Sequence, residues 1–166
     1  MSRAATLGAH RVSRPRRGIS RLTETALPSP QNDTQRYETG LQVRREVLGA
    51  EHVDRSLRRL SPVNEEFQDL ITRYAWGEIW TRDGLPRHTR SLLTIGLMVA
   101  LNRGEELKLH LRAARNNGVT RDEIKEVLLQ TAIYCGVPAA NAAFHAAEEI
   151  FAAQDAQDGT APPGQG

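Results

Sequence analysis

Cysteine is nearly absent from this chain, since Cys135 is the only one among 166 residues. An internal disulfide, a Cys-x-x-Cys redox pair and a zinc site built from cysteines each need at least two thiols in one chain. All three are therefore excluded for a single copy. Aromatic residues are also few, at 5% of the chain, so any local concentration of them is informative.

Long hydrophobic runs and a dominant charge are missing as well. The best apolar stretch, 92–101, is about half of the roughly 20 residues that a membrane span needs. The 22 basic and 20 acidic side chains give a net charge of +2, and the excess lies in residues 1–36, with seven arginines against two acidic residues. No apolar segment completes a secretory signal after Arg16 and Arg17. We therefore expect a cytoplasmic protein with neither a membrane partner nor a specific nucleic-acid partner.

Motifs for metals and nucleotide cofactors are also lacking. The sequence has no H-E-x-x-H motif, no glycine-rich phosphate loop and no G-x-S-x-G elbow. We expect no metal and no cofactor. If the chain is an enzyme, its chemistry must be proton transfer and electrostatics performed by ordinary side chains.

Helical periodicity dominates the middle of the chain, and no segment alternates with period two. Residues 1–33 and 155–166 lack periodicity, and we expect them to be disordered. Residues 34–154 are predicted to form one all-α domain, a multi-helix bundle. Helix stops at glycines and an N-terminal capping box at Thr120 to Glu123 set the boundaries. The expected helices are 37–48, 51–60, 61–81 with Ser61 as N-cap, 85–101, 105–116, 120–135 and 139–153.

Two histidines in this region are candidates for chemistry. His110 lies on the apolar stripe of its helix, where an imidazole is unexpected unless it has a role or a hydrogen-bond partner. A half-buried ring bonded to a backbone carbonyl explains the same position. His145 lies one turn after Asn141 in the alanine-rich last helix, where packing or surface exposure also accounts for it.

Charged and aromatic side chains gather just before the most apolar helix. Both tryptophans, Trp76 and Trp80, lie within five residues, beside Arg73 and Glu78. Such a cluster is typical either of one side of a binding site or of an aromatic packing face. Arg90 lies two residues before the apolar stretch 92–101, and partial burial of its guanidinium would require an anion.

The region from Tyr37 to Phe151 resembles the carboxymuconolactone decarboxylase family. The resemblance rests on "FQDLITRYAWGEIWTR" at 67–82, "TRSLLTIGLMVAL" at 89–101, and the long, specific segment 106–149, which begins "ELKLHLRAARNNGVTRDE". A related branch of alkylhydroperoxidase-like proteins uses a cysteine pair followed by a histidine. Aligned on His110, this chain has Arg103 and Glu106 in place of those cysteines, so peroxidase activity is excluded.

The resemblance implies a cofactor-free decarboxylation of 4-carboxymuconolactone to an enol-lactone, in protocatechuate breakdown through the β-ketoadipate pathway. It also implies an all-helical fold and a closed homo-oligomer, expected to be a hexamer. Under this hypothesis His110 donates a proton or a hydrogen bond, and Arg90 and Arg73 hold carboxylates. Glu78 orients His110 or an arginine. Trp76, Trp80 and Tyr134 would exclude water around the departing carboxylate. His145 is a further candidate for the site.

Two other interpretations stay open at this point. One is a non-catalytic oligomeric helical module, in which the candidate residues would be buried or scattered. The other is a decarboxylase or isomerase of a different lactone acid, because no residue in the sequence can be identified as one that recognises the lactone ring.

Overall fold

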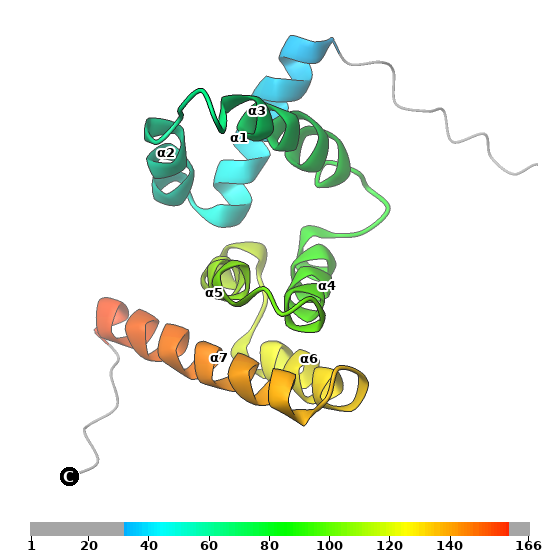
Figure 1. Cartoon of the computed structure of the whole chain (residues 1–166), viewed down its shortest axis with the longest axis vertical. Helices are drawn as coiled ribbons and strands as arrows, with labels where there is room; N and C mark the ends of the chain where they lie inside the picture. Colours follow the sequence, from blue (N-terminus) through cyan, green and yellow to red (C-terminus); the bar gives the residue numbers. More distant parts are fainter. Residues whose placement is uncertain (1–31, 160–166) are drawn as a thin grey trace, which may run out of the picture. The chain divides into compact units, whose positions relative to one another are not determined.

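A computed structural model describes residues 32–159, which belong to one compact unit, and every regular element in that range is helical (Figure 1). The predicted all-α class is confirmed for this part of the chain. Residues 1–31 of the predicted extension 1–33, and residues 160–166 of the predicted tail 155–166, lie outside the described residues. The elements are α1 (Asp33–Leu48), α2 (Ala50–Arg58), α3 (Glu65–Ile71), the π-helix η1 (Thr72–Ile79), α4 (Arg87–Ala100), α5 (Gly104–Ala113), the 3-10 helix η2 (Ala114–Asn117), α6 (Arg121–Tyr134) and α7 (Val137–Asp158).

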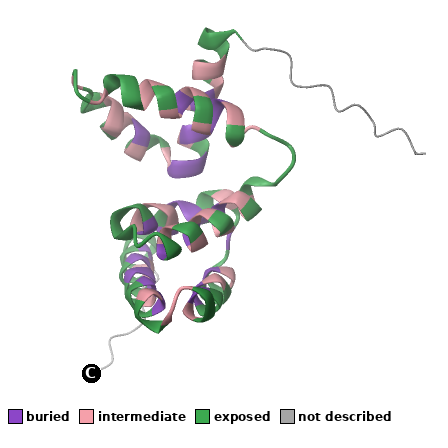
Figure 2. Cartoon of the chain, turned by 45° about the vertical axis from the view of Figure 1, so that its right-hand side comes forward, coloured by how far each residue is buried: buried purple, intermediate pink, exposed green. Residues whose placement is uncertain are grey.

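Two hydrophobic clusters hold these helices together. The larger one joins α4, α5, α6 and α7 around residues such as Ile95, Leu111 and Leu128, all essentially without solvent exposure. The smaller one joins α1, α2 and η1 around Val47, Val53 and Trp76. Helix α5 and its 3-10 continuation take part in both clusters, so this segment connects the two halves of the fold. Figure 2 shows buried residues on the sides of the helices that face their neighbours.

Helices α1 and η1 approach each other so closely that their backbones touch. A Cβ atom on Gly40 of α1 would collide with the carbonyl oxygen of Thr72, and one on Gly77 of η1 would collide with the carbonyl oxygen of Arg36. Only glycine fits at both positions, because the colliding atoms belong to the backbone and cannot rotate away. This contact packs the π-helical segment against α1.

Several predicted helix ends are confirmed. Gly49 ends α1 with φ of 93°, and Gly118 follows η2 in the left-handed region with φ of 74°. The side chain of Thr120 accepts from the backbone of Glu123, and the Glu123 carboxylate accepts from the backbone of Thr120, which completes the capping box. Each signal is a local one, so it does not depend on the rest of the fold.

Other boundaries differ from the prediction. Ser61 is not the N-cap of a helix, because its N–H donates to the Asn64 side chain and its carbonyl accepts from Asn64 and Glu65, which forms a turn before α3. Residues 114–117 tighten into a 3-10 helix rather than continuing α5. Helix α7 continues to Asp158, past the predicted end of the domain at 154. Gly159 is the first residue after it in the left-handed conformation.

The most apolar of the predicted helices, α4, is buried on one side only. Ile95 and Val99 are in the core, whereas Leu93, Leu97 and Leu101 form a half-exposed stripe at i, i+4 and i+8.

Within residues 32–159, none of the helices is long and apolar enough to cross a membrane.

Candidate functional site

The tryptophan pair lies at the junction of η1 with α1 and α2. Trp76 is 7% exposed and packs in the smaller hydrophobic cluster, and the Trp80 ring lies 5.1 Å from it, centroid to centroid, with the planes tilted by 30°. Tilted aromatic pairs at this separation are favourable. Trp76 is therefore a core residue in this chain, while Trp80 lies partly exposed beside it.

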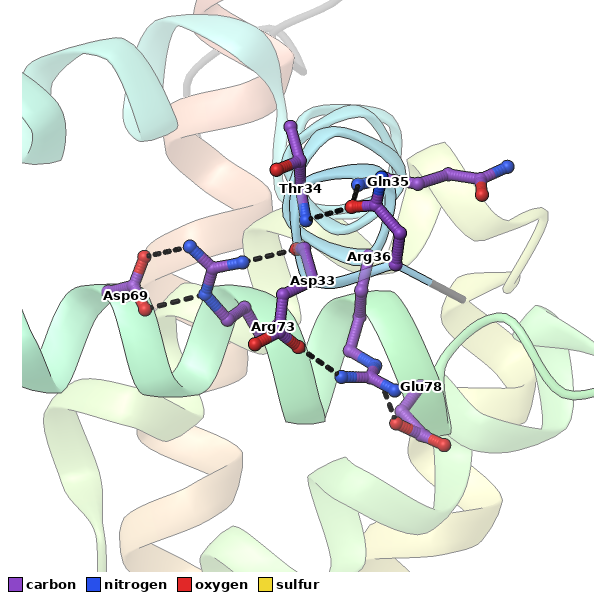
Figure 3. Close-up of polar contacts among 8 residues, drawn as sticks. Asp33, Thr34, Gln35, Arg36, Asp69, Arg73 and Glu78 are labelled. Carbon is purple, nitrogen blue, oxygen red and sulfur yellow. Dashed lines mark hydrogen bonds and ion pairs between the residues drawn. The ribbon is translucent and has the colours of Figure 1, made fainter. Parts of the chain in front are cut away.

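Arg73 and Glu78 are engaged in ion pairs beside α1, which Figure 3 shows. Arg73 grips Asp69 with two bonds, Nε to Oδ2 at 2.7 Å and Nη2 to Oδ1 at 3.0 Å, and a third N–H donates to the backbone oxygen of Asp33. The hydrogen bond and charge of Asp69 raise the pKa of Arg73. Glu78 lies 3.0 Å from Nε of Arg36. The sequence predicts His110 or an arginine as the partner of Glu78, and the structure pairs it with an arginine outside the predicted set.

Arg90 is partly buried near the start of α4. Its Nη2 donates to the carbonyl oxygen of Arg82 at 3.0 Å. Its Nε is sealed from solvent and has no hydrogen-bond acceptor among the described residues. A carboxylate approaching this guanidinium would supply the missing acceptor.

Tyr134 and His145 lie on the surface of the single chain. Tyr134, the last residue of α6, is 80% exposed. His145 is exposed on α7, with Nδ1 at 3.4 Å from a carboxylate oxygen of Glu148. Either residue would need a second copy of the chain nearby to line an enclosed site.

His110 is held partly buried on α5. Burial lowers the pKa of its imidazole, the positive charge of His52 lowers it further, and Glu106 one turn earlier raises it. Among residues 32–159, no hydrogen bond or ion pair joins His110 to Glu78, Arg73 or Arg90. Its ring nitrogens have no hydrogen-bond or ion-pair partner within the same range, so the ring is available to a ligand.

His52, whose charge lowers the pKa of His110, lines a groove of about 830 Å³ between α2, the α5–η2 segment and α7. We call it the basic groove. Its charged lining consists of Glu51, His52, Arg55, Arg59, Arg112 and Arg115. Its volume is within the range of pockets for small molecules, roughly 300 to 1,000 Å³.

Two of the four arginines in the basic groove have carboxylate partners. Arg55 lies 3.1 Å from Glu51, and Arg115 lies 3.2 Å from Asp158. Within the described part of the chain, Arg59 and Arg112 form no ion pair. The groove therefore carries two uncompensated guanidinium charges and a histidine.

A third positive charge lies behind the groove. Arg44 of α1 is 4% exposed, and its guanidinium donates to neutral oxygens of Thr72 at 3.2 Å, Gln68 at 2.8 Å and Ser56 at 3.5 Å. Ser56 lines the groove. No carboxylate bonds to Arg44 among the described residues, and burial lowers its pKa. Arg44, Arg55 and Arg112 in turn depress the pKa of His52, after burial itself.

Sequence reasoning missed the basic groove. His52, Arg55 and Arg59 share one side of α2, at i, i+3 and i+7, and this spacing is visible in the sequence. The contribution of Arg112 and of Arg44 depends on how α1 and α5 pack against α2, which no local pattern specifies. Among residues 32–159, no three metal-ligating side chains converge.

Comparison with known proteins places these residues in a family context. Residues 65–149 match the Carboxymuconolactone decarboxylase family. A 4-carboxymuconolactone decarboxylase of Acinetobacter baylyi is 60% identical over 120 residues, which is 72% of this chain and 90% of that protein. The nitrosuccinic acid decarboxylase npaB of Metarhizium robertsii is 49% identical over 102 residues, 61% of this chain and 71% of that protein. A Pseudomonas putida 4-carboxymuconolactone decarboxylase sequence is 55% identical over 47 residues, 28% of this chain and 98% of that sequence.

Proposed function

Because the chain belongs to the carboxymuconolactone decarboxylase family, we propose that it decarboxylates 4-carboxymuconolactone to the enol-lactone of 3-oxoadipate. The observation that carries this proposal is the 60% identity over 90% of the Acinetobacter baylyi decarboxylase. The reaction would be a step of protocatechuate breakdown through the β-ketoadipate pathway, in the cytoplasm.

The chemistry of this substrate requires little of the protein. The leaving carboxylate is attached to a ring carbon whose electrons can flow through the neighbouring double bond into the lactone carbonyl. When carbon dioxide leaves, negative charge develops on the carbonyl oxygen, and one proton must then reach carbon. The protein has to hold two carboxylates, stabilise that oxygen and supply the proton.

His110 is our proposed donor to the developing dienolate. Its imidazole has no hydrogen-bond partner among the described residues, so a ring N–H is free to donate to the carbonyl oxygen. A bound dianion raises the pKa of a nearby imidazole, because it favours the charged form, and the same ring can then deliver a proton.

We propose Arg90 as a carboxylate ligand, supported by the Nε that lacks an acceptor among residues 32–159. Arg73 is the second proposed ligand, although it must share its guanidinium with Asp69. Glu78 is proposed to act through Arg36 rather than on His110 directly. Trp80, with Trp76 beneath it, and the exposed Tyr134 and His145 are proposed to line the substrate site.

A homo-oligomer completes the proposal, with a hexamer expected from the family resemblance. The supporting observation is the half-exposed leucine stripe of α4 together with exposed Leu129 and Ile133 of α6. Apolar stripes of this kind are typical of subunit contacts. Light scattering on the intact chain should give a multiple of the 18.4 kDa subunit mass, and a monomer at micromolar concentration would contradict it.

A related acid is the second candidate substrate, because the Metarhizium robertsii relative is named for nitrosuccinic acid. The deciding experiment incubates the purified protein with each acid and records loss of substrate with release of carbon dioxide. 4-Carboxymuconolactone is short-lived and has to be made in the cuvette by a cycloisomerase. We expect rapid turnover of the lactone. Turnover of nitrosuccinic acid alone would identify that acid as the substrate instead. Turnover of neither acid would favour the non-catalytic oligomeric module.

A further inference from the structure

We propose that the basic groove between α2, α5–η2 and α7 binds a small dicarboxylate, with Arg59 and Arg112 as its principal ligands and His52 as a further donor. The inference deepens the proposed function and rests on it in one respect, because that reaction is what would bring a dicarboxylate to the chain. It assigns a binding role to residues that the sequence did not single out.

Charge balance selects the class of ligand. Arg55 and Arg115 are neutralised by Glu51 and Asp158, whereas Arg59 and Arg112 have no ion pair among the described residues. Two free guanidinium groups that line one groove, one at the end of α2 and one on α5, match a molecule with two negative charges. Arginine forks bind carboxylates with two parallel hydrogen bonds, which makes such pairs both strong and directional.

The interior behind the groove strengthens this preference. Arg44 is a buried cation whose partners are two hydroxyl groups and an amide oxygen, so its charge is not cancelled locally. Charges interact more strongly at low dielectric than in water, and Arg44 therefore adds to the positive potential at Ser56 and His52. An anion in the groove would offset the cost of holding these cations together.

The rest of the lining suits a polar ligand of modest size. Amide side chains of Asn64, Asn116, Gln154 and Gln157 supply hydrogen-bonding groups, and Leu109 and Ile150 supply apolar surface. The volume of about 830 Å³ admits a six-carbon acid with water around it. Leu109 is the sequence neighbour of His110, so the groove adjoins the part of α5 that carries the proposed donor.

The test is calorimetric titration of the full chain with adipate, a six-carbon dicarboxylate, beside hexanoate and inorganic phosphate. Wild type should bind adipate at least tenfold more tightly than hexanoate, because the second carboxylate finds a second arginine. Arg112→Gln and, independently, Arg59→Gln should each weaken adipate binding about tenfold. Both side chains are exposed and form no ion pair within the described chain, so their loss should not disturb folding.

The matched control is Arg58→Gln. Arg58 is exposed on the same helix, is adjacent to Arg59 and does not line the groove. This variant removes the same charge and should leave adipate affinity within twofold of wild type. The proposal is overturned if wild type does not bind adipate, if phosphate binds as tightly as adipate, or if Arg58→Gln weakens binding as much as Arg112→Gln. It is also overturned if Arg112→Gln changes the native mass, since the groove would then be a subunit contact.

Kinetics identify the source of the dicarboxylate and separate the two proposals. Competitive inhibition of decarboxylation by adipate that weakens in Arg112→Gln would place the substrate itself in the groove. Adipate binding without inhibition would indicate a separate dicarboxylate, and both results support the site. Adipate binding without any decarboxylase activity would contradict the proposed function alone. Decarboxylase activity without adipate binding would contradict the groove alone.

Discussion

Arg44 of α1 donates from Nη2 to Oε1 of Gln68 at 2.8 Å, so this buried guanidinium is bonded to an amide where a carboxylate would be usual. A buried cation without an anionic partner is costly, and proteins retain such groups mainly where another element needs their charge. In this chain the charge of Arg44 acts on His52, whose pKa is depressed in part by Arg44.

Replacing Arg44 by methionine should therefore raise the pKa of His52. The positive charge of Arg44 disfavours the imidazolium form, and its removal relieves that repulsion. The pKa is measured by following the His52 ring resonances during a pH titration. Arg58→Met, which removes an exposed charge from α2 itself, is the control and should leave the His52 pKa in place. An unchanged His52 pKa in Arg44→Met would contradict the contribution of Arg44 and leave burial, Arg55 and Arg112 as its causes.

The crossing of α1 and η1 predicts a strong effect at Gly40. Gly40→Ala should lower the free energy of unfolding by about 3 kcal/mol, the upper end of the usual overpacking cost, because the added methyl group meets the backbone of Thr72 and Gly77. Denaturation with urea measures the change. Gly84→Ala is the matched control, since no atom lies within 4 Å of the place that its added methyl group would occupy. Equal stabilities for the two variants would mean that the helices do not cross in this way.

The capping box at the start of α6 makes a second stability prediction. Thr120→Ala should lower the free energy of unfolding by about 1 kcal/mol, the usual value for an N-cap, whereas Thr89→Ala at an exposed position of α4 should lower it much less.

The hydrogen bonds from Thr120 and His88 lower the pKa of Glu123 to about 2 from its ordinary value near 4.5. A depressed carboxylate stabilises the fold above its unfolded pKa, so this contribution should disappear as the pH falls from 4.5 towards 2. Urea unfolding across that range tests it.

These results show which parts of the fold could be predicted from the sequence. Gly49, Gly118 and the Thr120–Glu123 pair act on their own neighbours, and the helix ends predicted at these positions are confirmed. The turn at Ser61 is not predictable in this way, because Asn64 competes for its backbone. The π-helical form of 72–79 also escapes prediction, since it accompanies a backbone contact with α1 that has no local signal.

The candidate site divides in the same way. His110 can be identified from the sequence because an imidazole on an apolar stripe is anomalous within its own helix, and the structure leaves it half-buried and available to a ligand. Sequence reasoning gives His52 no role, because its significance comes from Arg44 and Arg112, which reach it from other helices. The proposed roles of Arg73 and Glu78 do not anticipate Asp69 and Arg36 as their partners.

Burial of His110 predicts a pH dependence of stability with a definite sign. Its pKa in the folded chain lies below the ordinary 6.5, so the unfolded chain takes up a proton first as the pH falls. This contribution to stability should thus be complete above about pH 6.5 and decline as the pH falls below that value. His110→Asn should reduce this decline without abolishing it, because the pKa of His52 is lowered as well. Urea midpoints at pH 7 and pH 5 measure it, and an identical decline in wild type and variant would contradict the burial of the ring.

The most direct test of the account is carbon dioxide release from freshly generated 4-carboxymuconolactone by wild type, His110→Asn and Glu105→Gln. Glu105 is exposed on the same helix and serves as the matched control. We predict rapid release by wild type and by Glu105→Gln, and a loss of at least 100-fold in kcat for His110→Asn with unchanged helicity and native mass. Full activity in His110→Asn would contradict the role of the histidine, and no release by folded wild type would contradict the decarboxylase itself.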